Sequence, residues 1–359
     1  MNAVQVERLS LVPQLAEHPD FDAHEEVVLF NTGELQAIIA LHNTARGPGM
    51  GGLRMWPYLN VAAALTDVLR LSRGMTYKSA LARLPHGGGK GVIIGDPRND
   101  KCETLWLAMG DFINSFQGRY IGGEDSGTSV ADMAVIASRT EWVAGIDPTS
   151  PHGGDPSPST AYGTFLGLKA AVRSRFGNGD LNGLRVAIQG VGNVGGHLAR
   201  LLSEAGARLV ISDINPANLA RVQAFAEAEV VPVSKIHAAD VEVFSPCAMG
   251  AVINDTSIDD LRAGVVAGAA NNQLATCAHG YALYERSILY APDYAVNPGG
   301  VIDIALRCRG EAARINAHIQ TIEGTLDEIF ARSAAERLPT HVVADRLAEE
   351  RFKEPGVVV

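Results

Sequence analysis

Two lysines stand twelve residues apart in segments that otherwise carry little charge: Lys78 in residues 75–79 (Met-Thr-Tyr-Lys-Ser) and Lys90 in residues 87–91 (Gly-Gly-Gly-Lys-Gly). A lysine that is withdrawn from water beside another cation has a lowered pKa, which suits it to base catalysis. A helix ending near Lys78 and a glycine-rich loop before Lys90 can deliver both side chains to one site. The residues alone leave a second interpretation open, in which both lysines are solvated at the surface.

The glycine run before Lys90 does not match a nucleotide phosphate loop. The G-x-x-x-x-G-K-[ST] spacing would require glycine at Leu84 and serine or threonine at Gly91. The residues that follow Lys90 also read as a strand, whereas a phosphate loop leads into a helix.

An acidic residue, Asp125, lies in a glycine-flanked turn, residues 123–127, directly after a predicted strand. Loops mounted on a rigid scaffold often carry binding and catalytic groups. A turn residue or a helix cap is the simpler interpretation of an isolated aspartate, so Asp125 gains weight only beside the two lysines.

A dinucleotide-binding fingerprint, G-x-G-x-x-G, occupies residues 190–195 between a predicted strand and a predicted helix. Gly190 permits the tight turn, Gly192 lets the backbone approach a pyrophosphate, and Gly195 allows the helix to pack closely. The helix N-terminus, with Asn193 and Val194, then faces the phosphates. A glycine-rich turn that binds no nucleotide is the alternative.

Asp213 ends the next predicted strand, 23 residues after Gly190. A carboxylate at this position accepts hydrogen bonds from the ribose 2′-hydroxyl and repels a 2′-phosphate, so we expect NAD as cofactor and not NADP. A surface carboxylate that caps the helix starting at Pro216 is the other interpretation.

The first 145 residues alternate strands and helices, which predicts one α/β domain. The predicted hairpin strands are 26–30 and 36–42; helices follow at 60–78, 105–117 and 130–138, and further strands at 91–95 and 120–122. Residues 147–158 hold four prolines and two glycines, a composition that predicts an interdomain linker.

The second half reads as a βαβ succession. Helices are predicted at 162–176, 195–204 and 216–227, strands at 185–189, 208–212, 241–244, 264–268 and 289–291, and a helical pattern from residue 302 to the end. The predicted fold is therefore α/β, with an N-terminal substrate and oligomerisation domain (1–148), a Rossmann-type NAD-binding domain (159–324) and a cleft between them. The C-terminal helices, about 325–359, are expected to pack back on the first domain.

The length, charge and cysteine content of the chain exclude several classes of function. A chain of 359 residues with 47% hydrophobic content suits two domains, and a formal net charge of −10 leaves no positive surplus for nucleic acid or an anionic membrane. The four cysteines (Cys102, Cys247, Cys277, Cys308) show neither metal-ligand nor disulfide spacing, so no metal site is expected. Without a signal peptide or an apolar run long enough for a membrane span, we expect a cytoplasmic protein.

Seven segments together resemble the Glu/Leu/Phe/Val dehydrogenase family, and the similarity runs from about His42 to Ile304. The segments are 47–55 (GPGMGGLRM), 75–78 (MTYK), 87–90 (GGGK), 124–125 (ED), 160–163 (TAYG), 268–274 (GAANNQL) and 297–300 (NPGG).

This resemblance implies a role for each matching residue. Lys78, with the backbone near Gly51 and Gly52, binds the substrate carboxylate; Lys90 activates the water that attacks the imine, and Asp125 shuttles the amine proton. Thr160 and the Cys247–Ala248 backbone are expected near the nicotinamide. Asn272 is expected to contact the substrate and Asn271 the cofactor, although the adjacency of the two asparagines leaves open which of them contacts the substrate.

The same resemblance narrows the substrate. Met50 and Ile304 stand where glutamate-specific members hold a lysine and a serine, and an apolar pocket rejects a side-chain carboxylate. Gly123 stands where leucine-type members have alanine, which favours phenylalanine. Val301 and Ile304 are as bulky as in the leucine type, so a leucine-, valine- or tryptophan-preferring member is the alternative.

Two other classes remain. A 2-hydroxy-acid dehydrogenase would need a catalytic histidine, for which His86 and His152 are candidates, but it would leave both lysines and Asp125 unexplained. A non-enzymatic NAD-binding regulator would not need the intact set of Lys78, Lys90 and Asp125. Family members form symmetric homo-oligomers, so we also expect one here.

Overall fold

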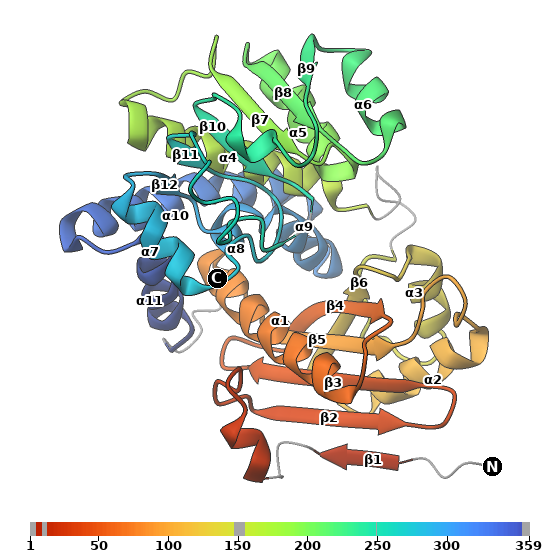
Figure 1. The fold of residues 1–359 in the computed structure, drawn as a ribbon. Coiled ribbons are helices and arrows are strands. Elements are labelled where there is room, and N and C mark those ends of the chain that lie inside the picture. Colours follow the sequence, from red (N-terminus) through yellow and green to blue (C-terminus); the bar gives the residue numbers. More distant parts are fainter. Residues whose placement is uncertain (1–4, 9–12, 147–154, 249, 354–359) are drawn as a thin grey trace. The chain divides into compact units, whose positions relative to one another are not determined.

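The structure, a computed structural model, describes residues 5–8, 13–146, 155–248 and 250–353 (Figure 1). These residues divide into two compact units. Unit 1 holds the chain up to Asp155 together with residues 348–353, and unit 2 holds Pro156–Leu347. The predicted C-terminal helices therefore belong mostly to unit 2, and only the end of the last helix joins unit 1.

Unit 1 is built on a six-stranded sheet in the order β1-β2-β3-β5-β4-β6 (Figure 1). The strands are β1 (Gln5–Arg8), β2 (Glu26–Asn31), β3 (Gln36–Asn43), β4 (Gly49–Trp56), β5 (Gly87–Ile94) and β6 (Tyr120–Glu124). β1, β2, β3 and β5 pair antiparallel, whereas β4 pairs parallel with both β5 and β6. β4 therefore lies between the strand that carries Lys90 and the strand that precedes Asp125.

Helices cover both faces of this sheet: α1 (Val61–Leu81), α2 (Glu103–Asn114) and α3 (Val130–Ile136), with a short 3₁₀ helix η2 (Pro13–Glu17). Alternate residues of β3 pack on opposite sides, because successive side chains of a strand point to opposite faces. Ile38 and Ala40 join the cluster around α1, whereas Ile39 and Leu41 join the cluster around α2. Asn60 caps α1 as predicted, since its side chain accepts the Ala63 N–H at 2.9 Å.

Unit 2 contains an all-parallel sheet in the order β12-β11-β10-β7-β8-β9. The strands are β7 (Arg185–Gln189), β8 (Arg208–Ser212), β9 (Ala228–Val230), β10 (Val243–Pro246), β11 (Val265–Val266) and β12 (Leu289–Tyr290). Counted from β7 this is the doubly wound order 3-2-1-4-5-6, whose direction reverses between β7 and β10. The predicted Rossmann-type architecture is confirmed.

The helices of unit 2 are α4 (Ser157–Phe176), α5 (Asn193–Glu204), α6 (Pro216–Gln223), α7 (Cys277–Glu285), α8 (Asp293–Val296), α9 (Gly299–Cys308), α10 (Ile315–Glu336) and α11 (Thr340–Lys353). Short 3₁₀ helices occur at η3 (Ile236–Ala238) and η4 (Ala312–Arg314). α11 begins in unit 2 and ends in unit 1, where the Arg351 side chain donates to the Leu81 carbonyl at the end of α1 at 2.7 Å.

One strand was missed and two local predictions were wrong. Residues 49–56, for which no element was predicted, form β4, and Gly87–Gly89 belong to β5 and not to a loop. Both strands are buried between neighbours, so pairing and packing decide their conformation more than intrinsic propensity does. The predicted linker ends before residue 158, because α4 starts at Ser157 and tolerates a proline in its first turn. Residues 147–154 of that linker, including His152, lie outside the described residues.

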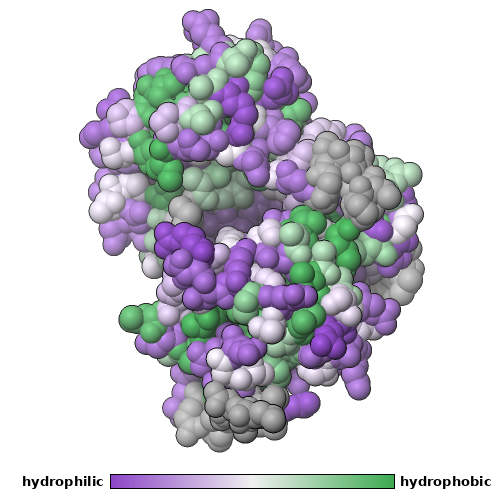
Figure 2. All heavy atoms as spheres, turned by 90° about the vertical axis from the view of Figure 1, so that its right-hand side faces the viewer, coloured by the Kyte–Doolittle hydropathy of each residue, from purple (hydrophilic) through white to green (hydrophobic). Residues whose placement is uncertain are grey.

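The surface mixes hydrophilic and hydrophobic residues over the face that Figure 2 presents. Among the exposed large hydrophobic side chains, Leu59 and Ile214 are the most exposed, at 91% and 90%. No helix among the described residues is both long and apolar enough to span a membrane.

A buried histidine ties the segment before β2 to α1. The Nε2 of His24 lies 3.1 Å from the Leu69 carbonyl oxygen and 3.1 Å from Ser72 Oγ, and its Nδ1 accepts the Asp22 N–H. That bond leaves Nε2 as the protonated nitrogen. Burial, and then the neighbouring His42 ring at 4.8 Å, lower the pKa of His24 to about 4.

We predict that unit 1 loses stability as the pH falls from about 6.5 to about 4. The pKa of His24 in the folded protein lies below its ordinary value of 6.5. Between these two pH values His24 is therefore protonated in the unfolded chain but not in the folded protein. The loss amounts to roughly 3 kcal/mol once the pH is below 4. Urea midpoints at pH 7 and pH 4.5 measure it. His24→Gln should remove the larger part of the pH dependence, and an unchanged dependence in that variant would contradict the assignment.

Candidate active site

Lys90 and Asp125 form an ion pair across strand β4, which has a glycine, Gly52, at the position between them. Lys90 is buried in β5, Asp125 follows β6, and the Lys90 Nζ lies 2.7 Å from Asp125 Oδ2. On the intervening strand β4, Gly52 pairs in register with Gly123 of β6. A methyl group on Gly52 would lie only 2.7 Å from the Asp125 Cβ. The ion pair therefore depends on the glycine at position 52.

The charge state of Asp125 follows from its surroundings. Burial by itself raises the pKa of this carboxyl, but the positive charges of Lys90 and Arg54 outweigh burial and lower the pKa to about 2. Asp125 is thus an anion at neutral pH.

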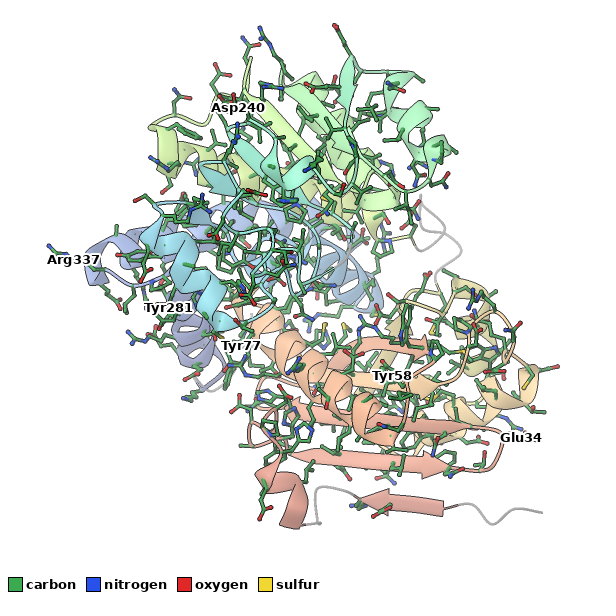
Figure 3. The ribbon with its side chains drawn as sticks, viewed as in Figure 1. Glu34, Tyr58, Tyr77, Asp240, Tyr281 and Arg337 are labelled. Atoms are coloured by element: carbon green, nitrogen blue, oxygen red, sulfur yellow. The ribbon has the colours of Figure 1, made fainter. Side chains whose placement is uncertain are left out.

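Arg54 is a member of this site that sequence reasoning missed. Its Nε donates to Asp125 Oδ2 at 3.2 Å, and its Nη1 donates to Asp67 of α1 at 3.1 Å. Tyr58, which precedes α1 and is labelled in Figure 3, donates its hydroxyl to the same Asp67 at 2.5 Å. Arg54 follows Gly52 by two residues, so strand alternation places both on one face of β4. That signal becomes readable only once β4 is known to be a strand.

The other predicted residues of unit 1 surround the same strands. A Cβ on Gly51 would meet Met75 of α1 at 3.3 Å and the Gly89 carbonyl oxygen of β5 at 1.8 Å, so helix and strands approach closely there. Lys78 lies in the last turn of α1, and Met50 is buried on β4. The buried Tyr120 hydroxyl donates to the Gly51 carbonyl at 2.8 Å and fixes this backbone.

Gly123 differs from its register partner Gly52 in the space around it. A methyl group there would meet only the Ala144 carbonyl oxygen, at an ordinary 3.7 Å. The backbone of β6 therefore does not require glycine at position 123. The space that a side chain would fill at position 123 can instead accommodate part of a ligand.

The glycine fingerprint of unit 2 lies at the reversal point of the sheet, where β7 ends. Gly190 has φ +88°, a conformation that favours glycine, and its N–H donates to the Ser212 carbonyl at 2.8 Å. A Cβ on Gly195 would lie 2.0 Å from the Gly190 carbonyl oxygen, whereas a Cβ on Gly192 would meet nothing within 4 Å. The turn thus leaves open space over Gly192, at the N-terminus of α5, where Asn193 and Val194 stand. These residues fit a dinucleotide pyrophosphate.

Asp213 holds the glycine turn while keeping acceptor capacity. Its Oδ2 accepts the Val191 N–H at 2.8 Å and its Oδ1 accepts the Asn215 N–H at 2.8 Å. Each carboxylate oxygen has a second lone pair, so the group can also accept a ribose hydroxyl.

Arg221, which was not predicted, supports the turn from the other side. It donates to the carbonyl oxygens of Val191 and Gly192 at 2.9 and 2.8 Å. The C=O and N–H of a trans peptide point in opposite directions. With both carbonyl oxygens bound to Arg221, the N–H groups of Gly192 and Asn193 therefore point away from Arg221.

Cys247 and Ala248 lie against the fingerprint at the end of β10. The Cys247 N–H donates to the Gln189 carbonyl at 2.8 Å, and a Cβ on Gly190 would lie 2.6 Å from the Ala248 Cβ. Burial raises the pKa of the Cys247 thiol. Their backbone therefore borders the predicted dinucleotide site.

Thr160 of α4 meets the start of α9. A Cβ on Gly300 would lie 2.5 Å from Thr160 Oγ1, so the two helices pack closely through glycine. Val301 and Ile304, three residues apart, are partly buried on α9. Asp303 between them is buried and accepts hydrogen bonds from Ser159 and Arg307.

Asn271 and Asn272 occupy different environments. The Asn297 side chain donates to Asn271 Oδ1 at 2.8 Å, which links the two motifs 268–274 and 297–300. Asn272 has φ +53° and donates its backbone N–H to Asp293 at 2.9 Å, as a turn residue does. The side chain of Asn271 is therefore the one that a neighbouring motif positions.

Comparison with known proteins finds matches along both units. Residues 27–142 match the Glu/Leu/Phe/Val dehydrogenase dimerisation domain, and residues 155–217 and 211–346 match the Glutamate/Leucine/Phenylalanine/Valine dehydrogenase domain. The chain is 47% identical to a leucine dehydrogenase of Geobacillus stearothermophilus over 92% of this chain and 91% of that protein. It is 44% identical to a valine dehydrogenase of Streptomyces virginiae over 94% and 96%.

A crystal structure of L-tryptophan dehydrogenase from Nostoc punctiforme has the same fold, with a TM-score of 0.81. The two sequences are 41% identical, and the match covers 93% of this chain and 97% of that one.

We predict that Gly52→Ala destabilises unit 1 by about 1–3 kcal/mol, because the added methyl overlaps the Asp125 Cβ and the Glu124 carbonyl oxygen, both 2.7 Å away. Gly123→Ala is the matched control in the paired strand and should change the free energy of unfolding by less than about 0.5 kcal/mol. Urea unfolding followed by tryptophan fluorescence compares the two. Equal effects of both substitutions would show that Gly52 is not kept for steric reasons.

Proposed function

This chain belongs to the Glu/Leu/Phe/Val dehydrogenase family, and we propose from that premise that it deaminates a hydrophobic L-amino acid oxidatively with NAD, leucine or valine being preferred. It is an amino-acid dehydrogenase, an oxidoreductase whose family uses a nicotinamide cofactor. The observation that carries the chemical proposal is the ion pair of Lys90 with Asp125 across Gly52.

The proposed reaction converts the amino acid, water and NAD⁺ to a 2-oxo acid, ammonium, NADH and a proton. A nicotinamide bound at the fingerprint would supply the acceptor for the hydride of the substrate Cα. Lys78 and the backbone at Gly51 and Gly52 hold the substrate carboxylate, which orients the Cα–H bond. Lys90 then removes a proton from the water that adds to the imine, and Asp125 exchanges a proton with the departing amine.

Each of these steps needs the local charges that unit 1 provides. The carboxylate of the substrate needs a cation, and the water needs a base that has lost its proton. Asp125, as an anion, stabilises positive charge that develops on the substrate nitrogen. Its lowered pKa means that Asp125 is ionised before it exchanges that proton.

The proposed substrate differs from the phenylalanine that Gly123 first favoured. The relatives described above are named for leucine, valine and tryptophan, so they support the aliphatic or tryptophan alternative better. Met50, Val301 and Ile304 remain the proposed apolar determinants, and they disfavour glutamate because a buried carboxylate would lack a partner. In place of Asn272, we propose Asn271 for the substrate contact, since the Asn297 side chain donates to Asn271 Oδ1 and positions it.

Tryptophan or another aromatic amino acid is the second candidate. The space beside Gly123 favours it, because nothing in β6 demands a glycine there. A difference of one methyl group is worth about 1–3 kcal/mol of discrimination, so both substrate classes can be turned over at different rates.

The first experiment measures NADH formation by the full chain at alkaline pH with L-leucine, L-valine, L-tryptophan, L-phenylalanine and L-glutamate. We expect kcat/KM to be highest for leucine or valine and negligible for glutamate. Lys90→Gln and Asp125→Asn should each lower kcat roughly 10²- to 10⁴-fold. Binding of NAD should be unchanged in both variants, because the fingerprint belongs to unit 2.

The outcomes separate the alternatives. Faster turnover of tryptophan or phenylalanine than of leucine would replace the aliphatic proposal by the aromatic one. If NAD binds but no amino acid is oxidised, another nicotinamide enzyme or an NAD-binding regulator becomes the better interpretation.

The preference for NAD is tested at Asp213. Asp213→Asn retains an acceptor for the Val191 N–H but removes the charge that repels a 2′-phosphate. We expect the ratio of the Kd values for NADP and NAD to fall about tenfold in this variant. Asp240→Asn, an exposed carboxylate of the same unit, is the control. A ratio that does not change would show that Asp213 does not select the cofactor.

We propose that the chain forms an oligomer because of the family to which it belongs. The first domain match is described as a dimerisation domain, and we expect a homo-oligomer of this chain. Light scattering of the purified protein measures its size.

A further inference from the structure

Asp125 is bound by two cations through one carboxylate oxygen. Lys90 Nζ and Arg54 Nε both contact Oδ2, at 2.7 and 3.2 Å. Arg54 comes from β4, which lies between β5, the strand that carries Lys90, and β6, the strand that precedes Asp125.

Arg54 is itself fixed from its far side. Its Nη1 donates to both oxygens of Asp67, at 3.4 and 3.1 Å, and Asp67 also accepts the Tyr58 hydroxyl. The guanidinium thus bridges Asp125 and Asp67, which a planar group with several fixed donors can do and an ammonium cannot do as well. Burial lowers the pKa of Arg54, but Asp125 and Asp67 outweigh burial and raise it, so the bridge stays charged.

The proposed reaction creates a need for a second cation. Lys90 must be neutral when it takes a proton from water, and in that state it no longer offsets the charge of Asp125. Burial favours the protonated carboxyl, so Asp125 with neither a charged Lys90 nor another cation beside it would bind a proton more readily. Arginine does not lose its proton at accessible pH, so Arg54 supplies a charge that does not vary through the cycle.

We propose that Arg54 is a positioning residue for the amino-acid dehydrogenase reaction, which holds Asp125 oriented, and ionised until the amine supplies a proton, while Lys90 passes between its charged and neutral forms. This inference rests on the proposed function, because it assumes that Lys90 acts as the base. Arg54 acts through Asp125 and Lys90 and is not assigned a contact with the substrate.

Other ionisable groups around Asp125 do not replace Arg54. Glu124 and Tyr120 of β6 are acids, and burial raises the pKa of each, so neither supplies a positive charge. Asp67 on α1 is an anion that accepts from Arg54, and Tyr58 donates its hydroxyl to Asp67. Arg54 and Asp67 should therefore influence Lys90 in opposite directions.

The test is the dependence of kcat on pH, between pH 6 and 11, for the best amino-acid substrate of the wild-type full chain. In Arg54→Gln, Lys90 loses a neighbouring cation and gives up its proton less readily. We expect the pH of half-maximal kcat to rise by about 1 unit and the maximal kcat to fall at least tenfold. KM for NAD should stay unchanged, since the cofactor fingerprint lies in unit 2.

Two further variants separate charge from fold. Arg54→Lys restores the charge but not the bridge, so the midpoint should return toward wild type while kcat recovers only in part. Arg70→Gln removes another arginine–aspartate pair of the same unit, between α1 and Asp20, and should leave the profile in place. Thermal unfolding of each variant reports damage to the fold separately.

Asp67→Asn keeps the proposal testable even where Arg54→Gln does not fold. Losing a negative charge near Arg54 makes the site more positive, so the midpoint should move to lower pH, opposite to Arg54→Gln. A midpoint that stays at the wild-type pH in both variants, with only the melting temperature lowered, would overturn the positioning role. A wild-type enzyme that oxidises no amino acid would instead contradict the proposed function itself.

Discussion

The candidate site depends on one ion pair formed over a strand that has no side chain in the way. Lys90 and Asp125 belong to segments on either side of β4, and they touch because Gly52 leaves the path open. The same need for close approach explains why Gly51 and Gly88 are glycine, since a methyl at either would strike backbone of β5 or α1. Glycine here lowers intrinsic strand stability, and packing by α1 and α2 compensates for it.

Charge in this site is shared among four groups and is not confined to one pair. Lys90 and Arg54 face Asp125, and Arg54 in turn faces Asp67. With Lys90 protonated the two cations and two anions balance, so a proton leaving Lys90 changes the net charge of a largely buried cluster. Such a cluster responds strongly to proton transfer because little water is present to screen it.

In unit 2, charged side chains and glycines hold the backbone of the predicted dinucleotide site. Its glycine turn is held by Asp213 through an N–H group and by Arg221 through two carbonyl oxygens, so its backbone is fixed before any ligand arrives. A preformed turn reduces the ordering that binding must bring about. The glycines at α4 and α9 likewise bring motifs that are distant in the sequence into direct contact.

The sequence by itself determined the family, the α/β architecture and the fingerprint with Asp213, because these rest on local patterns: hydrophobic periodicity, turn residues and motif spacing. It did not reveal β4, whose glycines lack strand propensity and which is a strand only because β5 and β6 pair with it. For that reason Arg54, Asp67 and Tyr58 also escaped notice. Side chains from β4 and α1 converge on Asp125 only after register and helix packing are set, and no local pattern encodes that convergence.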